Sequence, residues 1–280
     1  MSDSSKDLTG TTIVVTGASD GIGAEAAKVL HARGATVLVT GRSASKLAPI
    51  AEAVGSEPLV ADFARLDDVR RLAGEIAERA PRIDVLMNNA GGTFAPTRTT
   101  ADGHEPNLQI NHLAPFLLTH LLKPQLTSGE GSLVLNTSSI ANNIGRVNLA
   151  DLDRVRRSEF VAYGTGKLMN ILFTRGISQR WGAEGVVSAA VHPGPVGSSF
   201  GRDSWFIGLL YRSPLKRFGT ISVASGAAPL VALAARGADP AIDGRYYSRF
   251  TADGLESKQA KDQRLIDGLW DASLRLTGLA

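Results

Sequence analysis

Residues 11–23 read TTIVVTGASDGIG and carry the clearest local signal of the fold. The β-branched run IVV at 13–15 stops before a glycine, and a helical pattern then begins and continues as AEAAKVLHARG. A strand, a glycine turn and a helix in this order let the backbone approach a pyrophosphate at the helix N-terminus, where amide donors and the helix dipole favour anions. Gly17, Gly21 and Gly23 are spaced G-x-x-x-G-x-G, not G-x-G-x-x-G. The stretch predicts a nucleotide-binding turn, with an ordinary glycine-rich βα loop as the alternative.

Short β-branched runs alternate with helical stretches along the chain, which predicts an α/β fold with a parallel sheet. Strands are expected near 11–16, 36–40, 58–61, 83–88, 132–137, 186–191 and 245–248. Helices are expected near 21–33, 43–54, 67–80, 103–127, 161–182, 222–236 and 258–277. The runs VLVT, VLMN and SLVLN are apolar almost throughout, as in strands that helices cover on both faces. No repeat or low-complexity linker divides the sequence, so residues 1–280 are predicted to form one domain.

Tyr163 and Lys167 lie four residues apart in AYGTGK, so a helix would place both side chains on one face. A phenol has a pKa of about 10 in water, which is too high for a general base at neutral pH. Lowering this pKa by roughly 3 units takes about 4 kcal/mol, which a cation at ~4 Å supplies at an effective dielectric constant of ~20. The pair is therefore a candidate general acid and base. The alternative is a solvated helix face that carries Tyr and Lys by chance.

Six motifs occur in the order found in the short-chain dehydrogenase/reductase superfamily, which the chain resembles over roughly residues 8–250. They are TGASDGIG, NNAG at 88–91, Asn111, Ser139, YxxxK at 163–167 and HPGPV at 192–196. DGHEPNLQINHLAPFLLTHLL, YGTGKLMNILFTRGI and LWDASLRLTGL resemble its retinol-dehydrogenase-like and WW-domain-oxidoreductase-like branch. The resemblance implies a single Rossmann-type doubly wound domain: a seven-stranded parallel sheet of order 3-2-1-4-5-6-7 with helices on both faces. Ligand would bind at the carboxyl ends of the strands.

The same resemblance implies a role for each catalytic residue. Tyr163 would donate a proton to a carbonyl oxygen or accept one from an alcohol, and Lys167 would lower the tyrosine pKa and hold the nicotinamide ribose. Ser139 would hold the substrate oxygen, and Asn111 would position a water that links Lys167 to solvent. Hydride would pass directly between the nicotinamide and the substrate carbon. Ser138 is the rival for the serine role, but NTSS aligns best with the family when its last serine is catalytic.

The end of the second strand, VLVTGRS, bears on the choice of nucleotide. An acidic residue there would bind the ribose 2′-hydroxyl and repel a 2′-phosphate. By the family pattern that position falls on Gly41, and Arg42 and Ser43 then offer a cationic fork and a hydroxyl. NADP(H) is therefore the predicted cofactor, and NAD(H) is less favoured. Asp20 is a counter-signal if it points toward the phosphate, and Arg42 could instead flank the start of a surface helix.

Further cofactor contacts are predicted where strands end. Asp62 matches the residue that contacts adenine in this family, although an ordinary turn residue fits equally well. Asn88 is weighed evenly between tying strands together and touching the cofactor, and the backbone of HPGPV would hold the nicotinamide carboxamide. The predicted cofactor-binding residues are Gly17, Ser19, Asp20, Gly21, Ile22, Gly23, Arg42, Ser43, Asp62, Phe63, Asn89, Ala90, Gly91, Tyr163, Lys167, Pro193, Gly194, Val196 and Ser198.

Two features depart from the common family pattern. Gly-Thr-Gly separates Tyr163 from Lys167, where helix-compatible Ser and Ala are usual, and each glycine costs a helix interior roughly 1 kcal/mol relative to alanine. Close approach of the cofactor or of a neighbouring helix would explain the glycines. The interval between Ser139 and Tyr163 is also longer than in the shortest members, so residues 140–162 are expected to form an extra loop beside the site.

Residues 197–221 occupy the place of the family's mobile lid and carry large apolar side chains: Phe200, Trp205, Phe206, Leu209, Leu210 and Tyr211. They predict a bulky hydrophobic or aromatic substrate, unless they only pack the lid onto the body. Residues 251–280 are expected to form the closing helix of the branch. The leading hypothesis is an NADP(H)-dependent oxidoreductase that interconverts a carbonyl and an alcohol. The alternatives are an NADP(H)-sensing regulatory module without turnover, and a same-fold enzyme that reduces a carbon–carbon double bond or epimerises a sugar.

Composition argues against several other classes of protein. The 280 residues include no cysteine, which excludes a disulfide, a thiolate nucleophile and a cysteine metal site. The five histidines show no ligand spacing, so no metal is predicted. A net charge of +3 without a basic block predicts no nucleic-acid partner. MSDSSKDLTG lacks the features of a signal peptide and no run reaches the length of a membrane span, so the expected location is the cytoplasm, with a homodimer or homotetramer as candidate assemblies.

Overall fold

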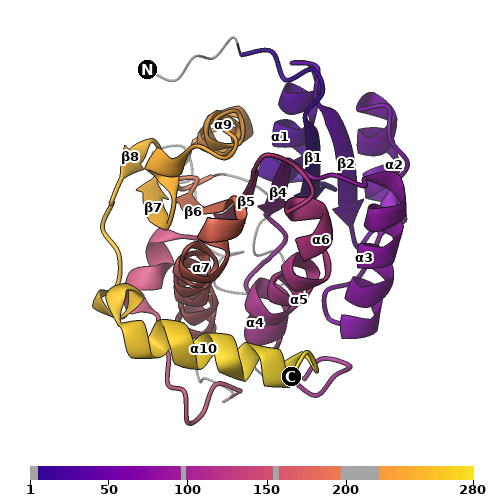
Figure 1. Cartoon of the computed structure of the whole chain (residues 1–280). Coiled ribbons are helices and arrows are strands. Elements are labelled where there is room, and N and C mark those ends of the chain that lie inside the picture. The colour runs from indigo at the N-terminus through magenta and orange to yellow at the C-terminus, as the bar shows by residue number, and fades with distance from the viewer. Residues whose placement is uncertain (1–5, 96–98, 154–157, 197–220) are drawn as a thin grey trace.

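The computed structural model describes residues 6–95, 99–153, 158–196 and 221–280. Its strands form one sheet in the order β3-β2-β1-β4-β5-β6-β7-β8 (Figure 1). Neighbouring strands pair in parallel, except for the last two, which are antiparallel. The strands are β1 Thr12–Thr16, β2 Thr36–Gly41, β3 Leu59–Val60, β4 Val85–Asn88, β5 Ser132–Thr137, β6 Val186–His192, β7 Arg245–Ser248 and β8 Thr251–Ala252.

The first seven strands confirm the predicted α/β class and the order 3-2-1-4-5-6-7. The eighth was not predicted: β8 is two residues long and pairs with β7 across a tight turn. In that turn Arg249 has a φ of 56°, a left-handed conformation that few non-glycine residues adopt. The expectation of one helix over 251–280 is therefore wrong at its start. Residues 251–252 are a strand, and the closing helix α10 begins only at Gln263.

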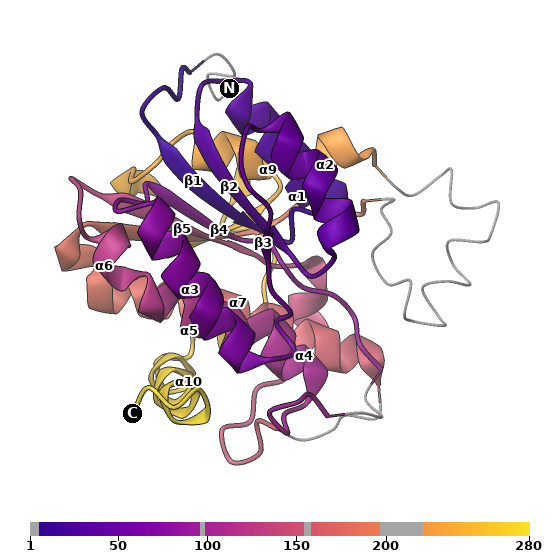
Figure 2. The ribbon, with the colours of Figure 1, turned by 90° about the vertical axis from the view of Figure 1, so that its right-hand side faces the viewer.

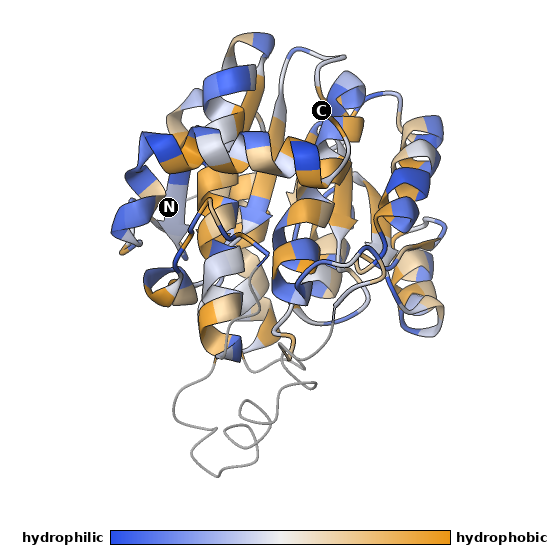
Figure 3. Cartoon of the chain, turned by 90° about the horizontal axis from the view of Figure 1, so that it is seen from below, coloured by the Kyte–Doolittle hydropathy of each residue, from blue (hydrophilic) through white to orange (hydrophobic). Residues whose placement is uncertain are grey.

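Helices cover both faces of the sheet (Figure 2). One apolar core joins the sheet to α1, α2 and α9, and a second joins it to α3, α5 and α7. Helix α10 packs against α7, where a Cβ on Gly176 would lie 2.8 Å from the Trp270 ring. Figure 3 shows hydrophobic strands between helices that carry both hydrophobic and hydrophilic residues, as expected of a sheet between two amphipathic layers. The longer helices are α1 Gly21–His31, α2 Ala44–Ala53, α3 Leu66–Arg79, α5 Ala114–Leu121, α7 Glu159–Trp181, α9 Val223–Ala234 and α10 Gln263–Leu276.

The single helix expected over 103–127 is wrong, because this region is divided. It consists of α4 Pro106–Leu108, the π-helical segment η1 Gln109–Leu113, helix α5 and α6 Lys123–Leu126. Pro115 accounts for the break, since it has no N–H to donate to the carbonyl four residues earlier, that of Asn111. The N–H of Ala114 instead donates to Gln109 five residues back, which is the π pattern. The remaining short helical segments are η2 Ile140–Ile144, η3 Gly182–Glu184, η5 Pro240–Ile242 and η6 Lys258–Lys261.

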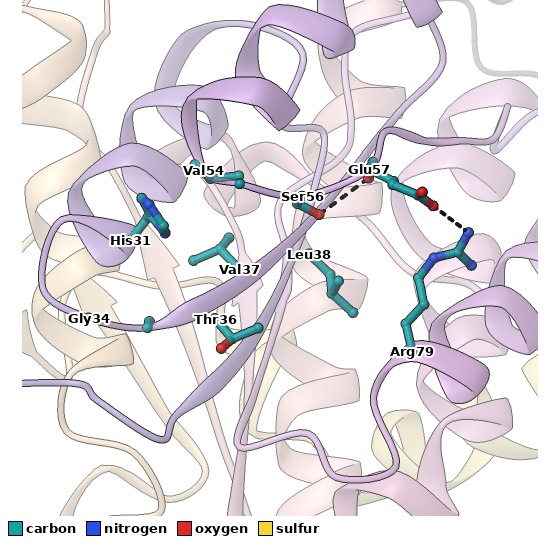
Figure 4. A pocket seen from close by; sticks show the side chains of 11 residues that line it. His31, Gly34, Thr36, Val37, Leu38, Val54, Ser56, Glu57 and Arg79 are labelled. Atoms are coloured by element: carbon teal, nitrogen blue, oxygen red, sulfur yellow. Dashed lines mark hydrogen bonds and ion pairs between the residues drawn. The ribbon is translucent and has the colours of Figure 1, made fainter.

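A hollow of about 510 Å³ lies beside the first residues of β2 (Figure 4). Thr36, Val37 and Leu38 of the strand line it, and Glu57 and Arg79 form an ion pair of 3.1 Å on one side. None of the predicted site residues contributes to its lining. Those residues follow the carboxyl ends of the strands, so the hollow lies at the other end of β2 and is not the candidate active site.

Two kinds of feature are absent from the described ranges. No helix there is both long enough and apolar enough to cross a bilayer. No group of three or more His, Cys, Asp or Glu side chains there could hold a metal ion.

Candidate active site

Helix α7 carries both members of the predicted acid–base pair. Tyr163 and Lys167 lie one turn apart, and the Lys167 Nζ lies 5.6 Å from the centre of the Tyr163 ring. Both residues are buried, with 8% of Tyr163 and 2% of Lys167 exposed to solvent. The ammonium thus lies beside the phenol ring, and a nearby cation favours the phenolate. The acid–base role of the pair stays a prediction.

Lys167 is held by the end of strand β5. Its Nζ donates to the carbonyl of Thr137 at 3.0 Å, and the side chain of Asn170 donates to the same carbonyl at 3.1 Å. Burial lowers the pKa of Lys167 to about 8, because the charged ammonium is removed from water. The amine therefore remains protonated at neutral pH, and its charge is only weakly screened in this surrounding.

The two neighbouring serines differ in their hydrogen bonds. Ser138 is 1% exposed, and its hydroxyl donates to the carbonyl of Lys167 at 2.8 Å. The Ser139 Oγ accepts the N–H of Ala141 at 3.2 Å as the N-cap of η2. An oxygen that accepts in this way keeps its own O–H for donation to another group. The geometry therefore supports Ser139 for the substrate-binding role and Ser138 for a structural one.

Asn111 lies in the π-helical segment η1, and its side chain clamps Gly92. The Asn111 Nδ2 donates to the Gly92 carbonyl and the Oδ1 accepts the Gly92 N–H, both at 3.0 Å. A Cβ on Gly91 would lie 2.5 Å from the Asn111 Oδ1 and 3.1 Å from the Lys167 Nζ. Asn111, Gly91 and Lys167 are thus brought together as the sequence predicted. The water-positioning role of Asn111 stays a prediction.

The two unusual glycines of α7 are explained by close packing. A Cβ on Gly164 would lie 2.4 Å from the carbonyl oxygen of Ala141 in η2. A Cβ on Gly166 would lie 3.0 Å from both the carbonyl oxygen of Asn107 and the Cβ of Asn111. The glycines therefore let the Ser139 turn and the Asn111 turn rest directly on the α7 backbone. Of the explanations considered for the sequence, close approach of a neighbouring helix accounts for them.

The glycine turn has backbone conformations that suit glycine. Gly17 and Gly21 have φ values of 67° and 60°, which L side chains rarely adopt. A Cβ on Gly23 would lie 2.5 Å from the carbonyl oxygen of Gly17, a backbone atom that cannot easily move. Asp20 is the N-cap of α1 and its carboxylate accepts the Gly21 N–H at 2.7 Å. The glycines therefore let the turn pack closely and lead directly into the N-terminus of α1, where main-chain amides favour an anion such as a pyrophosphate.

The asparagine side chains of NNAG mainly hydrogen-bond to neighbouring elements and hold them together. The Asn88 side chain donates to Thr119 and to Asn136 at 3.0 Å each, which favours its structural role over cofactor contact. The Asn89 side chain donates to the carbonyl of Thr16 at 3.0 Å, and the Ala90 N–H donates to the Thr16 hydroxyl at 2.9 Å. Asn89 and Ala90 thus hold the glycine turn in place. Any contact of theirs with a cofactor comes in addition to this.

At the end of β2, the Ser19 side chain occupies the position that a side chain at residue 41 would take. A Cβ on Gly41 would lie 2.0 Å from the Ser19 Oγ, so a larger residue would displace that serine. The Ser19 Oγ is buried and has no hydrogen-bond partner within the described residues. Arg42 follows as an exposed residue, and the Ser43 Oγ lies 3.3 Å from the Ser45 Oγ at the start of α2. A buried hydroxyl without a partner costs free energy, which a ligand that hydrogen-bonds to it would recover.

Asp62 and Phe63 lie after β3 in a tight turn. The Asp62 Oδ1 accepts the N–H of Ala64 at 3.0 Å, which is the turn role that the sequence left open. The Phe63 ring is 6% exposed and belongs to the apolar core, and its carbonyl accepts a hydrogen bond from Gln109 at 3.2 Å. The Phe63 side chain is therefore not available to contact a nucleotide, and only its backbone could make the predicted contact.

The loop after β6 carries the last predicted cofactor contacts. Pro193 is buried, and Gly194 has a φ of 101°. Burial and then the charge of Arg249 lower the pKa of His192 to about 4, so its ring is neutral at pH 7. A backbone bridge joins Val196 to Ile221.

Val196 and Ile22 also meet the start of α9. A Cβ on Gly226 would lie 2.3 Å from the Val196 Cγ2 and 3.1 Å from the Ile22 Cγ2. These two side chains therefore pack the glycine turn and the β6 loop against one helix. Ser198 and the expected lid 197–221, apart from Ile221, lie outside the described residues.

Three polar residues of this region were missed by the sequence reasoning. Asn170 shares the Thr137 carbonyl with Lys167, and its position seven residues after Tyr163 on the same helix face was an available signal. Asn142 and Tyr246 bond to each other behind Ser139 at 3.3 Å. They are distant in sequence, so no spacing rule could have joined them.

Comparison with known proteins identifies the family. The family model for short chain dehydrogenase matches residues 11–205. A candidate daunorubicin C-13 ketoreductase, DnrU, of Streptomyces sp. (strain C5) is 40% identical over 97% of this chain and 94% of its own length. Retinol dehydrogenase 12 of Homo sapiens is 35% identical over 97% of this chain and 88% of its own length.

Solved structures give the same result. A crystal structure of an uncharacterized protein from Mycobacterium paratuberculosis superposes with a TM-score of 0.77 at 31% identity, covering 97% of this chain and 95% of the other. The NADP complex of RhlG from Pseudomonas aeruginosa superposes with a TM-score of 0.69 at 22% identity, covering 91% of this chain and 98% of the other, and shows the shared fold. The chain therefore belongs to the short-chain dehydrogenase/reductase superfamily, as an oxidoreductase similar to the retinol dehydrogenases.

Proposed function

We propose that this protein is an NADP(H)-dependent oxidoreductase that interconverts a carbonyl and an alcohol on a bulky hydrophobic or aromatic substrate. The observation that carries the proposal is the buried ammonium of Lys167, 5.6 Å from the centre of the Tyr163 ring. A protein that only senses a nucleotide has no use for such a proton-transfer pair.

Each side chain has a defined part in the reaction. Tyr163 donates a proton to the carbonyl oxygen during reduction and accepts one from the alcohol during oxidation. Lys167 stabilises the phenolate by its charge, and Ser139 donates its O–H to the substrate oxygen. The nicotinamide, when bound, supplies or accepts the hydride. The glycine turn, Ser19 and Arg42 would hold its nucleotide portion.

The preference for NADP(H) rests on the residues at the end of β2 and on Ser19 beside them. Gly41 offers no carboxylate, and Ser19 fills the space in which one would lie. The buried Ser19 hydroxyl has no partner among the described residues and suits a phosphate oxygen, which accepts hydrogen bonds. Arg42 is exposed at the same strand end and can form a forked, charge-assisted pair with a phosphate. The Asp20 carboxylate accepts the N–H of Gly21, which ties it to the turn.

Replacing Arg42 by Ala should reduce the preference for NADPH over NADH by about tenfold to a hundredfold, because a charge-assisted hydrogen bond contributes roughly 1.5–3 kcal/mol. The dissociation constants of both nucleotides, measured by fluorescence titration for both proteins, check this. Arg264→Ala, an exposed arginine on α10, is the control and should leave the ratio unchanged. Equal affinities of the native protein for the two nucleotides would contradict the NADP(H) assignment.

The preference for an apolar substrate rests on the surroundings of Ser139. Ile140, Ile144 and Phe160 leave 48%, 47% and 37% of their surface exposed, close to Ser139 and Tyr163 in sequence. The packing of η2 on α7 brings Ile144 against Gly164, next to Tyr163. Ile140 and Ile144 lie in the same short helix η2, and a contiguous exposed apolar surface is typical of a binding site. The relatives named as a ketoreductase of daunorubicin and as retinol dehydrogenases act, by those names, on bulky molecules.

Replacing Ile140 and Ile144 together by Ala should raise KM about tenfold or more for bulky apolar ketones and less than threefold for small ones. Partial loss of two apolar contacts is expected to cost up to a few kcal/mol of substrate binding. Steady-state kinetics on a series of ketones of increasing size measure the difference. Leu149→Ala, which alters a side chain packed against Gly268 in α10, is the control. Equal changes for small and large substrates would remove the support for a hydrophobic substrate.

The proposal as a whole is tested by a panel of aldehydes, ketones, alcohols and activated alkenes, followed by NADPH absorbance. Turnover of bulky ketones, aldehydes or alcohols supports it. Turnover of alkenes alone would assign the chain to reduction of carbon–carbon double bonds. Tight NADPH binding without turnover of any compound would favour a sensing module.

A further inference from the structure

Asn142 occupies a fully buried position directly behind Ser139. It is 0% exposed, and its side-chain amide makes three hydrogen bonds. The Nδ2 donates to the main-chain carbonyl of Ser139 at 2.8 Å and to the Tyr246 hydroxyl oxygen at 3.3 Å. The Oδ1 accepts the N–H of Ser257 at 2.8 Å. One amide thus joins the Ser139 turn to strand β7 and to the segment before η6.

These bonds hold the main chain of Ser139, and the main chain sets the direction of the Ser139 hydroxyl. Ser139 caps η2, and its carbonyl accepts both the main-chain N–H of Asn142, at 3.0 Å, and the side-chain amide of the same residue. On the other side, the Ala141 carbonyl lies against Gly164 of α7, one residue from Tyr163. The turn is therefore held against α7 on one side and tied to β7 and the segment before η6 on the other, and the Asn143 side chain adds a bond to the Leu255 carbonyl.

Tyr246 is a suitable anchor for this amide. It lies in β7, is 0% exposed, and pairs across the sheet with Ala190 of β6. Burial, and then the charge of Glu256, raise the pKa of Tyr246 above its ordinary value, so the phenol stays neutral at every pH at which the protein works. Its position is therefore set by the sheet and its charge state does not vary.

We propose that Asn142 is a positioning residue for the reaction, which holds Ser139 at the distance from Tyr163 that substrate binding requires by tying its carbonyl to Tyr246 and Ser257. This inference rests on the proposed carbonyl–alcohol activity. Asn142 itself does not need to touch the substrate, because its effect reaches the active site through the main chain of Ser139. A displacement of about 1 Å at a reacting group can cost roughly a hundredfold in rate.

The test is Asn142→Asp in the full-length protein, with Asn143→Asp as the matched control. Aspartate can still accept the Ser257 N–H, and the Tyr246 hydroxyl can turn to donate to it, but it has no N–H for the Ser139 carbonyl. The Asn143 side chain makes the equivalent bonds to the carbonyls of Ile140 and Leu255 at 3.1 Å each, one residue along the same turn. We expect kcat to fall about 10- to 100-fold for Asn142→Asp and less than twofold for Asn143→Asp. The dissociation constant of NADPH should change less than twofold in both.

Hydrogen exchange supplies a readout that does not depend on turnover. Amides of residues 139–145 should exchange faster in Asn142→Asp than in the native protein, with α10 unchanged. An inactive native protein would contradict the proposed function, yet this exchange would still test the positioning. Unchanged exchange, or a folded Asn142→Asp variant with native kcat, would overturn the inference. If Asn142→Asp does not fold, Tyr246→Phe takes its place. Removal of that acceptor should lower kcat three- to tenfold without changing NADPH affinity, and a native kcat would count against the proposal.

Discussion

Replacing Tyr163 by Phe should lower kcat about a hundred- to ten-thousandfold while leaving NADPH affinity within about threefold of the native value. General acid–base catalysis contributes typically 10²–10⁴-fold, and the phenol is the group placed to transfer the proton. The substitution removes one hydroxyl and keeps the buried ring, so the fold and the glycine turn are expected to remain. Single-turnover rates with NADPH and the best ketone of the panel measure the loss.

Tyr247→Phe is the matched control for this experiment. Tyr247 is also buried, with 5% exposed, but its side chain lies in the core that faces α1 and α9. The same loss of a hydroxyl should there leave kcat within about twofold. A Tyr163→Phe variant with near-native kcat would show that the proton comes from elsewhere, and the assignment of the acid–base pair would be wrong.

Replacing Lys167 by Met should lower kcat about a thousandfold and weaken NADPH binding about tenfold. Methionine keeps most of the buried volume and removes the charge, so the phenolate loses a stabilisation of about 4 kcal/mol, which corresponds to roughly a thousandfold in rate. Affinity falls because the ammonium is also the expected partner of the nicotinamide ribose. Thermal unfolding with and without NADPH separates loss of binding from loss of fold.

The replacement of Lys167 should also shift the pH dependence of carbonyl reduction in a defined direction. Burial lowers the pKa of Lys167 to about 8, so the ammonium is charged below pH 8 and is lost as the pH rises through that value. Reduction by the native protein should therefore decline above about pH 8. Without the cation the tyrosine pKa returns toward about 10, so the alkaline decline in Lys167→Met should move to higher pH. An unchanged profile would mean that Lys167 does not act on Tyr163.

Much of the fold could be predicted because local signals and the sheet rules agree. The IVV run before Gly17 and the amphipathic stretch after it required a strand, a turn and a helix in fixed order. The predicted strands lie within two residues of those observed at both ends. The prediction of a single helix over 103–127 was wrong because Pro115 interrupts the helical hydrogen bonds, and apolar periodicity does not reveal this. Strand β8 was not predicted because a strand of two residues is too short to show an alternating pattern.

The candidate site could also be predicted only in part. Spacing alone placed Tyr163 beside Lys167, since residues four apart on a helix share a face. Spacing could not choose between Ser138 and Ser139, because that choice depends on which hydroxyl bonds to the Lys167 carbonyl of another element. It also could not show that the Asn111 side chain clamps Gly92.

Periodicity, glycine turns and helix spacing were enough to place most strands and helices and the residue types available for proton transfer, and the family resemblance implied the strand order. How these groups are held could be learned only from the packed structure. Gly164 and Gly166 matter because two other turns rest on them, and Asn142 matters because Tyr246 and Ser257 lie beside it. Such contacts join residues far apart in the chain, and their hydrogen bonds and burial arise only when the sheet and helices pack.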